Sequence, residues 1–286
     1  MITVSAPGKI HLLGEHTVVY GKPALLSAIN LRVTVTVGKS DQNYPLLRKT
    51  VEKIIKKKFK VSKIPDYSIQ SDLPVGSGLG FSAAGSAAII AALLSYFKIK
   101  WDKALINELT FEAEKVFHGT PSGGDNTTVV NGGLIMFQKG RIPVFFNSKI
   151  KNLCLINSGK PVETTKQMVE IAKAKIRSIL DDQERLVKEL ISVLREGNEK
   201  EFIKIIRAGE KNLEKIGVVS PFAKSIIRKV EKSGGAAKIS GAGGAKKASG
   251  ILLCYHKDKK VIENIAKTFQ LPFFSVSLGA EGLRKE

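Results

Sequence analysis

Residues 74–90 read Pro74-Val-Gly-Ser-Gly-Leu-Gly-Phe-Ser-Ala-Ala-Gly-Ser-Ala-Ala-Ile-Ile90, a glycine-rich turn that runs directly into an apolar segment. The apolar part predicts a buried helix that reaches about residue 97. Because glycine has no Cβ, Gly76, Gly78 and Gly80 let backbone N–H groups approach a ligand closely. The positive N-terminal end of the following helix favours phosphate at the same place. The stretch therefore predicts a phosphate-binding loop.

This loop matches neither of the two best-known phosphate-binding patterns. No Gly-Lys-Ser/Thr closes it, and its glycine spacing misses the dinucleotide fingerprint. A glycine turn before a helix is often only a turn, so the interpretation depends on two charged segments, 5–21 and 112–133. A second glycine-rich turn, Ser240-Gly-Ala-Gly-Gly244, follows an apolar strand and suggests a second backbone wall around one polyphosphate or substrate.

The composition indicates a soluble globular protein. The chain has 286 residues, of which 43% are hydrophobic and 25% charged, enough for one large domain or two ordinary ones. Its longest apolar stretch, about 83–97, is interrupted and too short to cross a bilayer, and the N-terminus lacks a signal-peptide pattern. Cys154 and Cys254 lie in apolar strand-like runs, which favours core thiols over a disulfide or metal site. We therefore expect a cytoplasmic location.

The charge balance is strongly basic, with a net charge of +20 from 46 basic and 26 acidic residues. Such a balance can attract nucleic acid, a membrane surface or small polyanions. In the densest block, 48–63, apolar residues recur at helical spacing and lysines fill the opposite face, as on a solvated helix. No basic groove with interleaved aromatic residues is visible. We therefore expect neither a nucleic-acid nor a membrane partner.

Hydrophobic periodicity predicts mixed helices and strands, with a domain boundary near residue 150 and a cleft between the two halves. The expected strands are 2–5, 10–13, 31–37, 67–71, 127–137, 142–146, 152–157, 236–239, 249–255 and 272–277. The expected helices are 45–60, the segment after the glycine loop to about 97, 105–117, 161–180, 182–196, 199–215, 221–232 and 258–268.

The first charged segment, Ser5-Ala-Pro-Gly-Lys-Ile-His-Leu-Leu-Gly-Glu-His-Thr-Val-Val-Tyr-Gly21, places Lys9, His11, Glu15 and His16 in an apolar run. Charged groups there are costly unless they are paired or face a wet cleft. One interpretation is a strand edge with solvated polar residues. The functional interpretation is a lysine that neutralises negative charge beside groups that hold a polar substrate.

The second charged segment joins a helical carboxylate to a loop carboxylate eleven residues later. Glu114 is expected near the end of a helix, and Asp125 in a Pro/Gly-rich loop that can bend it back toward the same cavity. One carboxylate suits a hard divalent cation and the other suits a hydroxyl proton. The alternative is a loop aspartate that caps the next element.

In this order and at these separations, the segments resemble the galacto-, homoserine, mevalonate and phosphomevalonate kinase superfamily, and its mevalonate kinases in particular. The resemblance rests on Pro7-Gly-Lys9 with Gly14-Glu-His-Thr-Val-Val-Tyr-Gly21, and on His118-Gly-Thr-Pro-Ser-Gly-Gly-Asp-Asn126. Segments 163–169 and 212–220 of the back half agree, so the resemblance covers nearly the whole chain.

The resemblance implies a role for each matching residue. Asp125 matches the catalytic aspartate and Lys9 the lysine that lowers the pKa of the substrate hydroxyl; both would contact the substrate. Glu15 and His16 fall where the family contacts mevalonate, and Gly241 and Ala242 of the second glycine turn are expected there too. Ser82 and Glu114 match the magnesium-coordinating pair. The ATP-phosphate loop would comprise Pro74, Gly76, Ser77, Gly78, Leu79, Gly80 and Ser82.

The implied fold class is α+β, a two-domain small-molecule kinase fold with its active site in the interdomain cleft. Residues 1–150 would form an ATP-binding half like domain 2 of ribosomal protein S5, and 151–286 a ferredoxin-like, helix-rich half. The implied reaction is ATP- and Mg²⁺-dependent phosphorylation of the 5-hydroxyl of mevalonate to 5-phosphomevalonate, in isoprenoid biosynthesis. The alternatives are a related kinase for phosphomevalonate, homoserine or a sugar, and a non-catalytic ligand-sensing relative. The resemblance also favours a homodimer.

Two departures from the family pattern concern the nucleotide site. Phe81 stands where the family has the first of two serines, although Ser82 is kept. After Gly244 the family's further glycines and cysteine are replaced by Ala245-Lys-Lys-Ala248, which makes the loop bulkier and more cationic.

Overall fold

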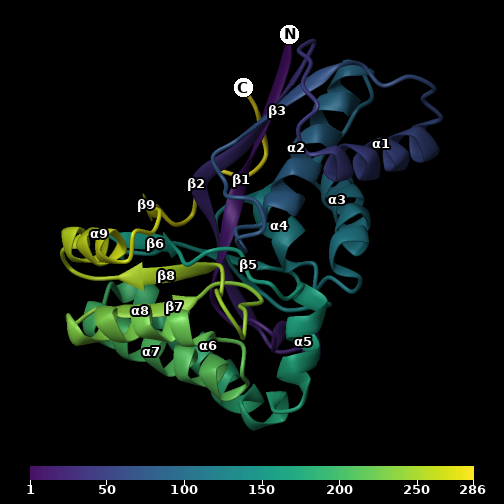
Figure 1. Cartoon of the computed structure of the whole chain (residues 1–286). Coiled ribbons are helices and arrows are strands. Elements are labelled where there is room, and N and C mark those ends of the chain that lie inside the picture. Colours follow the sequence, from purple (N-terminus) through teal and green to yellow (C-terminus); the bar gives the residue numbers. More distant parts are fainter.

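Two antiparallel sheets organise the structure, a computed structural model that describes residues 1–286 (Figure 1). The first sheet has the order β10-β1-β2-β4-β5, with β3 also paired to β2. The second has the order β7-β8-β6-β9. The strands of the first sheet are β1 (Ile2–Leu13), β2 (Ala24–Val37), β3 (Tyr67–Ser71), β4 (Leu134–Phe137), β5 (Val144–Phe146) and β10 (Arg284–Lys285). Those of the second are β6 (Leu153–Asn157), β7 (Ala236–Ile239), β8 (Ile251–Tyr255) and β9 (Phe273–Ser275).

Helix α2 (Phe81–Tyr96) is the centre of the first half. Every residue from Ala83 to Leu94 is buried, as expected for a helix that is apolar on all sides. It packs against β1, β2 and three surrounding helices, with which it forms the helical layer of this half. These helices are α1 (Pro45–Phe59), α3 (Lys103–His118) and α4 (Gly124–Asn131).

The helices of the second half are amphipathic, and three of the five pack on the second sheet (Figure 1). Four of the five begin at a side-chain cap: Thr164, Asn198, Ser220 and Asp258 each accept a hydrogen bond from a first-turn backbone N–H. The helices are α5 (Thr165–Lys173), α6 (Leu180–Glu196), α7 (Glu199–Lys215), α8 (Pro221–Lys232) and α9 (Lys259–Thr268). Short 3-10 helices span Val18–Tyr20 and Ile176–Ser178.

Three secondary-structure predictions were wrong. Residues 127–137 are not one strand, because α4 occupies 124–131 and β4 begins only at Leu134. Val129 and Val130 favour a strand locally, but they are fully buried in the main core as part of this helix. Strand β1 is continuous through Pro7, because a register shift between Pro7 and Lys9 accommodates the break. The predicted helix 161–180 ends at Lys173.

The chain returns to the first sheet at its C-terminal end. Strand β10 pairs with β1 through Val4↔Lys285 and Ser5↔Arg284, and Leu283 is buried in the main core. The guanidinium of Arg32 donates to the carbonyl oxygens of Glu281 and Gly282 at 2.9 and 2.8 Å.

The α+β class predicted from the sequence is confirmed. The domain boundary near residue 150 stays a prediction. Residues 278–286 come after that boundary in sequence but pair with strands and loops of the first half. No helix combines the length and apolar character needed to cross a bilayer.

Substitution of Gly132 is expected to loosen this C-terminal contact. Gly132 has φ 77° and ψ −167°, a backbone conformation open almost only to glycine, and an added Cβ would lie 2.2 Å from the Gly282 nitrogen. We expect Gly132→Ala to lower the free energy of unfolding by about 3 kcal/mol in urea titrations. Gly140→Ala is the control, since a Cβ there meets nothing within 4 Å and adds only backbone strain of about 1 kcal/mol. Equal losses of unfolding free energy in the two variants would contradict the close contact between Gly132 and the C-terminal segment.

Candidate active site

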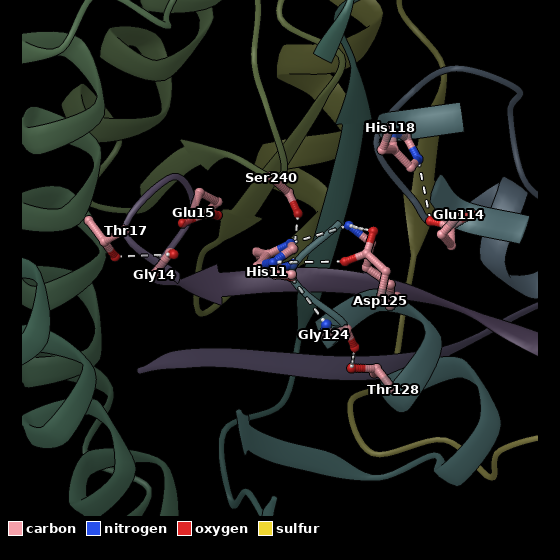
Figure 2. A network of polar contacts seen from close by, with 12 residues as sticks. His11, Gly14, Glu15, Thr17, Glu114, His118, Gly124, Asp125, Thr128 and Ser240 are labelled. Carbon is pink, nitrogen blue, oxygen red and sulfur yellow. Dashed lines mark hydrogen bonds and ion pairs between the residues drawn. The ribbon is translucent and has the colours of Figure 1, made fainter. Parts of the chain in front are cut away.

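The glycine loop before α2 connects the two halves of the molecule. On one side the Leu79 carbonyl accepts from the backbone N–H of Lys9 in β1 at 2.9 Å. On the other side the Ser77 carbonyl accepts from the N–H of Ile251 in β8, also at 2.9 Å. Residues that project from both halves meet at this point, as Figure 2 shows for His11 on β1 and Ser240 after β7. The loop therefore lies at the junction between the halves.

Glycine is required in the loop because other atoms approach its backbone closely. Gly76, Gly78 and Gly80 all have positive φ. A Cβ at Gly78 would lie 2.7 Å from the Ser240 carbonyl oxygen, and one at Gly80 would lie 2.8 Å from Lys9 Cγ. Gly80 is also the N-cap of α2 and supplies no side-chain cap. The first-turn N–H groups of a helix without such a cap are suited to an anion.

The predicted convergence of Lys9 and Asp125 is confirmed. Lys9 Nζ lies 3.0 Å from Asp125 Oδ2, and the Lys9 side chain is only 3% exposed. Asp125 lies in the first turn of α4, not in a loop as predicted, because α4 begins right after Gly123, whose positive φ ends the preceding loop. Burial alone would raise the pKa of the Asp125 carboxyl, but the charge and the hydrogen bond of Lys9 outweigh it and hold that pKa below its usual value. The carboxylate is therefore ionised at neutral pH.

His11 joins this pair, although the sequence assigned it no role of its own. Its Nδ1 lies 3.2 Å from Lys9 Nζ and its Nε2 lies 3.9 Å from Asp125 Oδ1. Its backbone N–H donates to Ser240 Oγ at 2.9 Å (Figure 2). Burial, with the nearby Lys9 charge, lowers the pKa of His11 to about 3, so the imidazole is neutral.

Glu15 and His16 are both buried beside the second glycine turn. Glu15 Oε1 forms an ion pair with Lys238 Nζ, and Oε2 has no hydrogen-bond partner. His16 Nε2 lies 3.1 Å from the Ala242 carbonyl oxygen. Lys238 was missed by the sequence reasoning, although a lysine inside the apolar strand Ala236–Ile239 was a signal that a buried carboxylate lies nearby.

The two glycine-rich turns face each other, as the sequence suggested. A Cβ at Gly241 would lie 3.6 Å from Gly78 Cα. Beyond this turn, Lys246 and Lys247 are exposed. Lys160, which the sequence reasoning also missed, lies along the outer side of the first loop, with Cε 3.3 Å from a Cβ built at Gly76. Three lysines thus lie in or beside the two turns.

Ser82 and Glu114, the predicted magnesium pair, are connected through His118. The Nε2 atom of His118 lies 3.3 Å from both Ser82 Oγ and Glu114 Oε2. Glu114 is 1% exposed, and its Oε1 has no hydrogen-bond partner. A buried carboxylate oxygen without a partner is the kind of ligand that a hard cation such as Mg²⁺ takes, and the Ser82 hydroxyl contacts the same imidazole as this carboxylate. No group of three or more His, Cys, Asp or Glu side chains suited to a metal occurs in the chain.

Phe81, which replaces a serine of the family pattern, packs on Tyr44. The two ring centroids are 4.7 Å apart. Phe81 is the first residue of α2, so the aromatic pair lies at the N-terminal end of that helix. The hydroxyl lost at this position is therefore replaced by apolar packing against the segment before α1.

Comparison with known proteins identifies the family. The chain is 33% identical over 84% of its length to a mevalonate kinase of Archaeoglobus fulgidus, of which the match covers 88%. The chain belongs to the mevalonate kinase family. A second member, from Thermococcus gammatolerans, is 29% identical over 100% of this chain and 98% of its own. The family's enzymes are ATP-dependent phosphotransferases that act on an alcohol, and this chain is accordingly one of them.

Family models and solved structures agree with this assignment. The N-terminal domain model of the GHMP kinases matches residues 45–133, and a galactokinase galactose-binding signature matches 2–39. The mevalonate kinase structure of Methanococcus jannaschii has a TM-score of 0.81 at 18% identity, covering 96% of this chain and 98% of that one. The Leishmania structure, described as L. major mevalonate kinase in complex with R-mevalonate, has a TM-score of 0.78 at 21% identity, covering 97% and 96%. The predicted kinase fold is confirmed.

Behind the site, two buried carboxylates share one ammonium. Glu210 is fully buried on α7; its Oε2 accepts from the Ile239 N–H at 3.0 Å, and its Oε1 has no partner. Lys238, the nearest cation, forms its ion pair with Glu15 instead. Burial therefore raises the pKa of Glu210 to about 8.

This elevated pKa predicts a pH-dependent stability. A carboxyl with a folded-state pKa of about 8 and an unfolded value of 4.5 binds its proton more tightly in the folded chain. Its contribution is fully present below the unfolded pKa and is lost as pH rises through the folded pKa. We expect Glu210→Gln to flatten the fall in urea-unfolding free energy between about pH 5 and about pH 8. The control is Glu214→Gln, which changes a partly exposed carboxyl on the same helix. An unchanged slope in Glu210→Gln would contradict the assignment.

Proposed function

We propose that the chain transfers the γ-phosphoryl group of ATP to the 5-hydroxyl of mevalonate, with Mg²⁺ as the metal. The observation that carries this proposal is the buried Lys9–Asp125 pair, held against a glycine loop at the start of α2. Phosphoryl transfer needs mainly positioning and charge neutralisation, and this arrangement supplies both. The names of the relatives support mevalonate as the acceptor.

The nucleotide phosphates would lie on the glycine loop and the N-terminal end of α2. Backbone N–H groups there are accessible because the loop glycines carry no Cβ. The proposed nucleotide-binding residues are those of the loop and the first turn of α2, namely Pro74, Gly76, Ser77, Gly78, Leu79, Gly80 and Ser82.

Asp125 would accept or orient the proton of the acceptor hydroxyl, because its carboxylate is ionised and partly open to solvent. Lys9 would lower the pKa of that hydroxyl and balance the charge that develops on its oxygen. An ammonium has three N–H donors. Two of those on Lys9 point to Asp125 and His11, so one is left for a substrate oxygen.

Mg²⁺ would be held by Ser82 and Glu114. When bound, the metal neutralises negative charge on the β and γ phosphates. Both residues also contact His118 Nε2, which would orient them while Glu114 Oε1, the carboxylate oxygen without a partner, faces the cation.

The remaining contacts to mevalonate are proposed for Glu15, His16, Gly241 and Ala242. Glu15 keeps one carboxylate oxygen, Oε2, without a protein partner, and a substrate hydroxyl would satisfy it. His16 and Ala242 are joined by a hydrogen bond, which fixes this wall of the site.

A cytoplasmic location, a homodimer and the lack of nucleic-acid and membrane partners stay predictions from the sequence.

Related kinases on this fold are the second candidate, and one finding favours a sugar acceptor: the galactokinase signature over residues 2–39. Turnover of ATP against mevalonate, phosphomevalonate, homoserine and galactose, followed by ADP release, separates these substrates. We expect mevalonate to give by far the highest kcat/KM. A higher value for any other acceptor would overturn the proposal, and ADP release with mevalonate excludes a silent ligand sensor.

Replacement of Asp125 by asparagine is expected to abolish most turnover. Asp125→Asn keeps the side-chain shape but removes the ionised oxygen, so kcat should fall by about 10²–10⁴-fold. ATP affinity, measured by calorimetry, should change little. Thermal stability should fall because the buried Lys9 ammonium loses its partner charge, so turnover is compared at a temperature at which both proteins are folded. Near-normal turnover would refute the catalytic assignment.

A change at Glu114 is expected to act on the metal. Glu114→Gln removes a buried charge that suits a cation, so the Mg²⁺ concentration for half-maximal turnover should rise by at least about tenfold. The matched control is Glu112→Gln on the exposed side of α3, where Glu112 pairs only with Lys115. An unchanged magnesium titration in Glu114→Gln would contradict the assignment.

A further inference from the structure

His11 occupies a place in the site that the proposed function does not yet use. It lies two residues after Lys9 in β1, and residues two apart in a strand project from the same face. The two side chains consequently meet, with Nδ1 of His11 3.2 Å from Lys9 Nζ. The imidazole is buried at the junction of the halves (Figure 2).

The contact fixes which nitrogen of His11 carries the hydrogen. Because burial lowers the pKa of His11 to about 3, the ring is neutral at physiological pH. Lys9 can only donate, so Nδ1 must be the acceptor and Nε2 must carry the hydrogen. That N–H faces Asp125 Oδ1 at 3.9 Å, too far for a direct hydrogen bond but oriented toward the carboxylate.

We propose that His11 is a positioning residue for the phosphoryl transfer, which holds the Lys9 ammonium through Nδ1 and faces the second oxygen of Asp125 through Nε2–H. This rests on the proposed function of Lys9 and Asp125. Without His11, two N–H donors of the ammonium would be free to rotate about the Lys9–Asp125 contact. With it, one N–H is left, directed at the substrate oxygen.

The side chain can be changed without loss of the contact to the second glycine turn. The bond to Ser240 Oγ comes from the backbone N–H of His11 and does not depend on the residue type. His11→Leu is close to histidine in size and lacks both nitrogens. His11→Asn restores an acceptor near the position of Nδ1 but has no donor at the position of Nε2.

The decisive test is steady-state kinetics of these two variants with ATP and mevalonate. We expect His11→Leu to lower kcat by about 10- to 100-fold, with each KM changed less than about threefold, because orientation and not binding is lost. His11→Asn should recover kcat to within about fivefold of the original chain. If His11→Leu keeps kcat within about twofold, or if His11→Asn falls as far as His11→Leu, the proposal is wrong.

A histidine elsewhere provides the control. His256 directly follows β8, next to Tyr255, which pairs with the first residue of β7. Ser240, the contact of His11, follows the last residue of β7, so His256 lies at the other end of that strand. His256→Asn should leave kcat and both KM values unchanged. Thermal unfolding and ATP binding are measured for all three variants. A His11→Leu protein that unfolds at the original temperature and still binds ATP has lost orientation, whereas a misfolded one would also lose ATP binding.

A second measurement does not depend on activity. Nitrogen NMR of histidine-labelled chain at neutral pH should show His11 with Nδ1 unprotonated and Nε2 protonated, and Lys9→Met should shift the Nδ1 resonance because that nitrogen loses its hydrogen-bond donor. A protonated Nδ1 in the original chain would overturn the proposal. If the original chain fails to phosphorylate mevalonate, the proposed function fails, and the NMR result still decides whether Lys9 fixes the ring of His11.

Discussion

The ion pair between Lys9 and Asp125 is the contact on which the rest of the site depends. A buried ammonium without a partner would be strongly destabilising, so the fold has to bring a carboxylate to this position. It does so by starting α4 immediately before Asp125. The stem of Lys9 crosses Gly80, where any side chain would collide with it. The pair therefore determines the path of β1, the residue at the N-cap of α2 and the point at which α4 begins.

Around this pair the charges are distributed unevenly between two layers. Beside the glycine loop, one lysine, one ionised aspartate and one neutral histidine are in contact. Behind them, Lys238 is shared by Glu15 and Glu210, and only Glu15 forms the ion pair. Since one ammonium cannot neutralise two buried carboxylates, burial keeps Glu210 protonated well above its usual pKa. The front layer is thus charged and partly open, and the back layer is close to neutral and closed.

Much of the fold was predictable because it follows local pattern. The strand over 67–71 and the helices over 199–215 and 221–232 have the predicted bounds, since alternating or helical spacing of apolar residues specifies them directly. The error over 127–137 arose where β-branched residues lie in a short, fully buried helix, and tertiary packing overrode local preference. The return of β10 to β1 had no local signal, because two residues cannot form a recognisable strand pattern.

The site was predictable to a similar degree. The family motifs located Lys9, Asp125, Glu114 and both glycine turns, and the contact between Lys9 and Asp125 follows from them. The partners of these residues did not follow: His118 between Ser82 and Glu114, and Lys238 beside Glu15, are set by the meeting of segments far apart in sequence. A charged residue inside an apolar run indicates that a partner exists, but only the packed structure says which one.

The pairing of β10 with β1 has a consequence for how the chain is made. Val4 and Lys285 are adjacent in the first sheet although most of the described chain separates them in sequence, so β1 is synthesised long before β10. Until residues 278–286 emerge, one edge of β1 and the apolar slot of Leu283 stay uncovered, although strands β1 to β5 of the same sheet can already pair. The nascent N-terminal half is consequently exposed to edge-to-edge association during translation, and closure of that edge is a late, long-range step of folding.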